Sequence, residues 1–107
     1  MTTFDEREMG FEAKYAHDAE VQFRVVSRRN RLLGLWAGGL MGLTGQGLED
    51  YAAAVIHSEI AHPDDADVLR KLHSDLSAAG LGMSESQISS KMAEMHAVAR
   101  TQIQKEL

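Results

Sequence analysis

Apolar residues recur at steps of three and four along almost the whole chain, and the strict alternation typical of strands is nearly absent. Such spacing places apolar side chains on one face of a helix, where other helices can bury them. A chain of 107 residues is long enough for one domain with its own core. The sequence therefore predicts a single all-α unit.

Start and stop signals divide the chain into helices. Ser84 and Gln87 form a capping box at the start of the last helix. Pro63 disfavours helical geometry in the residue before it, Gly80 suits a left-handed C-terminal cap, and the glycines within 42–47 form a break. The predicted helices are 19–42, 46–60, 65–79 and 85–105. Because short connections favour antiparallel neighbours, we expect a compact four-helix bundle.

The periodicity also assigns an inward face to each helix. The predicted core residues are Val25, Val26, Leu32, Leu33, Leu35, Trp36, Leu40 and Met41, then Leu48, Tyr51, Ala52, Val55 and Ile56, then Val68, Leu69, Leu72, Leu76 and Ala79, then Ile88, Met92, Met95, Ala99 and Ile103. Gly38 and Gly39 interrupt the first of these faces, and each costs about 1 kcal/mol relative to Ala. The helix either weakens there or admits a close neighbour.

A further helix start lies near the N-terminus. Thr3 and Glu6 fit a capping box, so a helix can begin at residue 3. An apolar stripe then follows in steps of four, four, four, three and seven residues. Its members are Phe11, Tyr15, Ala19, Phe23, Val26 and Leu33. One long helix, or two helices with a joint near His17 and Asp18, would satisfy this pattern.

The opening segment is only thinly apolar, because Glu8 occupies the position between Phe4 and Phe11 on that face. The later helices can close a bundle without it. A capped, sparsely apolar helix is marginal alone and can form fully in a partner's groove. We therefore predict a flexible or partly helical N-terminal arm at 1–18 and a four-helix bundle at 19–107.

Composition excludes several classes of protein. The formal net charge of −5 argues against a nucleic-acid binder held by phosphate contacts. The absence of cysteine excludes disulfides and thiol catalysis. No apolar run approaches the roughly 20 residues that cross a bilayer, so we expect a cytoplasmic protein with no membrane insertion.

No arrangement of residues indicates an enzyme or a metal site. The nearest candidates are His57, Glu59, His62 and Asp64. His57 and His62 are five residues apart across a helix end, whereas ligands on one helical face are three or four apart. The other histidines have no Ser or Asp arrangement of the triad kind. We expect no metal, no cofactor and no catalytic residue.

Charge is unevenly distributed along the chain. Residues 24–31 carry four arginines and no acid, and residues 32–67 carry six acids and no base. Arg24, Arg28 and Arg31 are spaced four and three apart, so they share a helical face. This arginine row could bind a phosphate or a carboxylate-rich surface. The alternative is a solvated face that pairs with the acidic N-terminal segment or with residues 49–67.

Four stretches of the sequence are distinctive in combination. In chain order they read "FDEREMGFEAKYAHDAE", "RRNRLLGLWAGGLMGL", "DDADVLRKLHSDL" and "ISSKMAEMHAVA". Together they resemble the zeta-subunit family of inhibitors of bacterial (alphaproteobacterial) F-type ATP synthases. The resemblance covers essentially the whole chain, and its first two stretches are the specific ones.

The resemblance implies a regulatory protein that binds the catalytic head of the ATP synthase, on the cytoplasmic side of the membrane, and stops ATP hydrolysis. The N-terminal segment would enter the alpha/beta interface near the gamma rotor, with the bundle as its anchor. The implied contact residues are Phe4, Arg7, Phe11, Lys14 and Tyr15. The family also implies weak ADP or ATP binding, a second role for Arg24, Arg28 and Arg31.

The free protein should be a monomer. Gly10 makes the free energy of helix formation in the arm less favourable by about 1 kcal/mol, so we expect a less helical free arm and weaker inhibition. The alternative function is a helical nucleotide- or anion-sensing module that acts through the arginine row.

Overall fold

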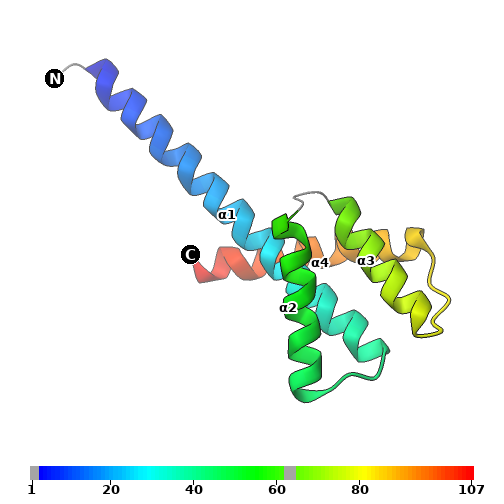
Figure 1. The fold of residues 1–107 in the computed structure, drawn as a ribbon. Coiled ribbons are helices and arrows are strands. Elements are labelled where there is room, and N and C mark those ends of the chain that lie inside the picture. The colour runs from blue at the N-terminus through cyan, green and yellow to red at the C-terminus, as the bar shows by residue number, and fades with distance from the viewer. Residues whose placement is uncertain (1–2, 62–64) are drawn as a thin grey trace.

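The fold consists of helices joined by short connections (Figure 1). The computed structural model describes the backbone of residues 3–61 and 65–107, and the side chains of 17–58 and 65–107. The helices are α1 (Thr3–Leu40), α2 (Gly45–Ala61), α3 (Asp65–Ala78) and α4 (Glu85–Glu106). The described residues contain no strand, which confirms the all-α prediction. The predicted bounds of α2, α3 and α4 are correct to within one residue at each end.

Helix α1 runs without interruption over 38 residues, so there is no joint at His17 and Asp18. At about 1.5 Å per residue such a helix is roughly 57 Å long, which accounts for most of the 64 Å long axis of the molecule. Its N-terminal half extends away from the other helices, and its C-terminal half lies among them (Figure 1). The division of the chain into an arm at 1–18 and a bundle at 19–107 stays a prediction.

Glycine ends both α1 and α3 in the same way. Gly80 adopts a positive φ of 79°, which favours a residue without a Cβ. Its N–H donates to the carbonyl of Ser77 at 3.0 Å, and the N–H of Leu81 donates to the carbonyl of Leu76 at 3.0 Å. This is the Schellman pattern, which satisfies the last carbonyls of a helix. Gly42, at a φ of 84°, ends α1 with the equivalent bonds.

The predicted capping box at the start of α4 is confirmed. The backbone N–H of Gln87 donates to Ser84 Oγ at 3.1 Å, and the N–H of Ser84 donates to Gln87 Oε1 at 2.9 Å. Met83 and Ile88, which flank the box, both pack in the main core. The start of the last helix is therefore fixed by local chemistry and by burial together.

The core forms two clusters around the C-terminal half of α1. The larger cluster joins all four helices through Leu33, Ala37, Val55, Val68, Leu72, Leu76, Ile88 and Met92. The smaller one joins α1 to α4 through Val25, Ala99 and Ile103, with Val21 and Leu32 at its border. All of these except Ala37 and Val21 are among the inward residues that the sequence predicts. Helix α1 therefore organises the domain.

The predicted stripe through Ala19 and Phe23 does not enter the core. Phe23 is 64% exposed, and Ala19 is exposed as well. The inward positions belong to Val21 and Val25, which stand on either side of Phe23 in the sequence. Residues two apart in a helix differ by about 200° around its axis, so Phe23 faces the opposite way.

Two other predicted core residues are exposed. Leu40, at 46% exposure, is the last residue of α1, where the chain turns away through Gly42. Ala79 lies one residue beyond the end of α3, next to the left-handed Gly80. In both cases the inward face ends slightly earlier than the apolar pattern.

Helices α1 and α2 approach each other closely and run antiparallel. A Cβ at Gly34 would lie 2.6 Å from Cα of Ala52, and a Cβ at Gly38 would lie 2.6 Å from Cδ1 of Leu48. Four residues forward along α1 thus match four residues back along α2. At Gly38 the close-neighbour alternative is correct, whereas Gly39 has no atom within 4 Å of a built Cβ.

We expect Gly34→Ala to destabilise the fold by about 1–3 kcal/mol, because the added methyl meets the backbone of α2 rather than a flexible side chain. Gly39→Ala, in the same helix but with open space around it, should stabilise the fold by up to about 1 kcal/mol through helix propensity. Urea denaturation of both variants measures the difference. Equal effects of the two substitutions would contradict the close approach.

Tyr51 connects α2 to α3 through a polar contact at the edge of the core. Its hydroxyl donates to Asp75 Oδ2 at 2.8 Å. Lys71 Nζ lies 3.1 Å from the same oxygen and 5.4 Å from the centre of the Tyr51 ring. Burial of the phenol, and then its hydrogen bond to Asp75, raise the pKa of Tyr51 above its ordinary value of 10.0.

Because the pKa of Tyr51 is raised in the folded state, its protonated hydroxyl stabilises the fold. This stabilisation is fully present below the ordinary pKa and is lost as the pH rises above it. The free energy of unfolding should therefore fall above pH 10.0, where the unfolded phenol ionises. Tyr51→Phe, which keeps the ring, should remove that part of the fall and cost about 0.5–1.5 kcal/mol at neutral pH. Urea denaturation at about pH 8 and about pH 11 tests this. The same alkaline loss in both proteins would exclude Tyr51 as its source.

Candidate functional site

Two members of the arginine row pair with carboxylates on the surface. Arg31 binds Glu49 of α2 with both guanidinium ends, Nη1 to Oε2 at 2.9 Å and Nη2 to Oε1 at 3.3 Å. The hydrogen bond to Glu49 and its negative charge raise the pKa of Arg31. Arg24 donates to Glu20, one turn earlier in α1, at 2.9 Å. The pairing of Arg31 with Glu49 matches the alternative of contacts to residues 49–67.

The third member of the row, Arg28, reaches the C-terminal end of α4. Its Nη1 donates to Gln102 Oε1 at 3.0 Å, and its Nη2 donates to Glu106 Oε1 at 2.7 Å. These partners are more than 70 residues away in the sequence, and spacing rules within one helix do not find them. The contact holds the last turn of α4 beside α1.

Arg29 is adjacent to the arginine row in the sequence, but its burial and its contact with α3 are not predicted by the sequence. It is 3% exposed, and its Nη2 donates to Asp65 Oδ1 in the first turn of α3 at 2.9 Å. Its Nε donates to Oδ1 of Asn30, which is 1% exposed. The signal was its place four residues after Val25 and four before Leu33, both of which are buried.

We expect Asp65→Asn to destabilise the fold by about 1–2 kcal/mol, since it removes a carboxylate that is bonded to the buried guanidinium of Arg29. Asp67→Asn is a matched control, because Asp67 lies in the same first turn and pairs with the exposed Arg70. That substitution should cost less than about 1 kcal/mol, typical of surface pairs. Chemical denaturation compares the two. A larger loss from Asp67→Asn would contradict a special role for Arg29.

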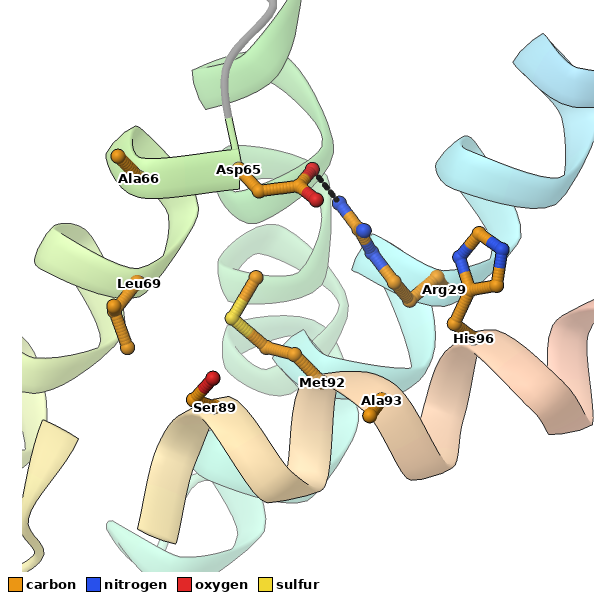
Figure 2. Close-up of a pocket in the computed structure, with 8 residues that line it drawn as sticks. All are labelled: Arg29, Asp65, Ala66, Leu69, Ser89, Met92, Ala93 and His96. Atoms are coloured by element: carbon orange, nitrogen blue, oxygen red, sulfur yellow. Dashed lines mark hydrogen bonds and ion pairs between the residues drawn. The ribbon is translucent and has the colours of Figure 1, made fainter. Parts of the chain in front are cut away.

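Arg29 forms one wall of a pocket between α1, α3 and α4 (Figure 2). The volume is about 650 Å³. The lining residues are Arg29, Asp65, Ala66, Leu69, Ser89, Met92, Ala93 and His96. The guanidinium of Arg29 points at Asp65, with Leu69 and Met92 farther along the wall. Ser89 and His96 are seven residues apart on α4, a rise of roughly 10 Å, so they do not form a hydroxyl–imidazole pair.

The arginine row lines a second, smaller pocket, which we call the Phe23 groove. It has a volume of about 380 Å³ and lies between α1, α2 and α4. The lining residues are Phe23, Arg24, Ser27, Arg28, Arg31, Ile56, Ile103 and Glu106. The structure thus brings the predicted anion-binding residues together, with each guanidinium bonded to a carboxylate. Nucleotide binding by this row stays a prediction.

The predicted partner contacts Phe4, Arg7, Phe11, Lys14 and Tyr15 lie outside the residues whose side chains are described. Among the described residues, no three His, Asp or Glu side chains gather as a possible metal site. None of the helices, over their described parts, is both long and apolar enough to cross a bilayer.

Comparisons with known proteins give a family and a related fold. Residues 1–102 match the model of the family described as ATPase inhibitor subunit zeta. A protein of 34% sequence identity, whose solution structure was determined by NMR, superposes with a TM-score of 0.69. That match covers 80% of this chain and 98% of the other one. No curated protein matches the sequence.

Proposed function

The chain belongs to the ATPase inhibitor subunit zeta family, and we propose that its N-terminal segment inhibits ATP hydrolysis by an F-type ATP synthase. The observation that carries this proposal is the division of α1. Its C-terminal half supplies the centre of the core, while its N-terminal half extends past the other helices and is available to a partner (Figure 1).

In the proposed mechanism, residues 1–18 enter the interface between an alpha and a beta subunit, next to the gamma subunit. A helix lodged in this interface would block the rotation of the central stalk during ATP hydrolysis. Such an inhibitor needs no catalytic residue, because it acts by steric block of the ATP synthase.

The proposed contacts are those that the family resemblance implies, and helical spacing is compatible with them. Phe4 and Phe11 are seven residues apart and share a face, and Tyr15 follows one turn after Phe11. Arg7 and Lys14 are also seven apart, which places their charges on an adjacent face. Apolar anchors beside cations are the usual composition of a helix that docks into a groove. The family match supports this assignment because it begins at residue 1 and includes the whole segment.

The full-length double variant Phe11→Ser/Tyr15→Ser should raise the concentration needed for half-inhibition at least about tenfold, since buried aromatic anchors dominate binding energy. The matched control is Met9→Ser/Ala13→Ser, because residues 9 and 13 lie on the opposite face of the same turns. The readout is ATP hydrolysis by the matching ATPase head, titrated with each protein. Circular dichroism checks that both variants keep their helices. Equal inhibition by both variants would refute the arm as the inhibitory element.

A further inference from the structure

We propose that the contact with the ATPase head continues past residue 18 and includes the Phe23 groove. The partner surface would be an apolar side-chain cluster bordered by carboxylates on a subunit of the head. This inference rests on the proposed function and adds a second contact, on the body of the protein. It assigns a role to exposed groups that neither the core nor the arm explains.

Phe23 is a solvent-exposed aromatic residue in the continuous helix α1. It is 64% exposed although it lies within a continuous helix whose neighbours Val21 and Val25 pack into the core. An isolated exposed apolar residue is common on protein surfaces. Here, however, the ring lies over a groove rather than on a convex surface, so a partner can cover both together.

The groove has an apolar floor built from two other helices. Ile103 of α4 is 3% exposed, and Ile56 of α2 is partly buried. Both line the groove together with Phe23. A partner side chain that enters it would therefore meet aliphatic groups from α2 and α4 and an aromatic ring from α1, which is the composition of an interface centre.

Phe23 also continues the apolar stripe of the arm. Phe11, Tyr15, Ala19 and Phe23 follow one another at four-residue steps, and residues four apart are neighbours on a helix surface. Ala19 and Phe23 are both exposed, so the core does not use this end of the stripe. Because α1 is continuous, a partner that holds residues 11 and 15 meets Phe23 about 12 Å farther along the same helix.

The arginines around the groove have N–H donors left for the carboxylates of a partner. Three of its lining residues are arginines, and one is an acid, Glu106. A guanidinium carries five N–H donors, and the bonds to Glu20 and Glu49 use one on Arg24 and two on Arg31. Glu20, Glu49 and Glu106 balance the three guanidiniums, so what the groove offers a partner is the N–H donors that these bonds leave over, which can bond to partner carboxylates.

The test compares Phe23→Ser with Leu40→Ser in the full-length protein. Leu40 is also exposed and lies at the far end of the same helix, about 26 Å away. Binding to the ATPase head is measured by calorimetry, and ATP hydrolysis is measured in parallel. Phe23→Ser should weaken binding about tenfold, as expected when a partly covered aromatic group is lost, while Leu40→Ser should match the wild type. Arg24→Gln should weaken binding severalfold and reduce its dependence on salt.

The possible outcomes distinguish a failure of the groove contact from a failure of the proposed inhibitory function. If the wild type inhibits and Phe23→Ser binds and inhibits equally well, the groove contact is wrong and the arm model stands. If the wild type does not bind the head, both proposals fail. Light scattering of the free protein tests whether a second copy of the chain occupies the groove instead. A dimer that Phe23→Ser abolishes would assign the groove to a second copy of the chain and overturn the inference.

Discussion

The contact of Gly34 with Ala52 is the constraint on which the rest of the domain depends. At this point the backbones of α1 and α2 are so close that a single methyl group would meet a Cα atom. The contact fixes the antiparallel pair, and the larger core cluster is built around that pair. Helices α3 and α4 then close the cluster from the other sides. Small residues at a helix crossing thus determine where large ones can be buried.

Arginines of α1 add a second layer of organisation. Arg31 reaches α2, Arg29 reaches α3 and Arg28 reaches α4, so each of the other helices is tied to α1 by its own carboxylate. Two of these pairs are exposed to solvent, and such pairs contribute little to stability. The pair of Arg29 differs, because its guanidinium is buried and costly to leave without an anion. Breaking such a pair is therefore more destabilising than the net contribution of the intact pair would suggest.

The sequence was sufficient for those features that depend on local chemistry. The capping box at Ser84 and the glycine cap at Gly80 are each set by a few adjacent residues, and both are correct. The helical periodicity identified most of the core for the same reason. Features that depend on a partner distant in the chain were missed. Examples are the close approach at Gly34 and the bond from Arg28 to Glu106.

The candidate site was predictable only in part, and Phe23 shows why. An apolar stripe at four-residue steps does not say which protein will cover it. The sequence places Ala19 and Phe23 on a stripe that runs into the first helix of the bundle, but on this part of the helix Val21 and Val25 pack into the core and Phe23 does not. Arg29 shows the reverse error, since a charged residue takes a core position when an acid at the start of α3 is within reach. Both outcomes depend on tertiary neighbours.

Because α1 is continuous, the number of residues between its extended segment and the core sets how the two are oriented relative to each other. One helix joins the extended segment to the core, so its rotation about the common axis is set by the number of residues between them. One inserted residue would turn the two ends against each other by about 100°, whereas seven would restore their alignment to within about 20°. A change in the length of this stretch therefore keeps the two ends aligned only when it is close to a whole number of turns, as with seven or eleven residues.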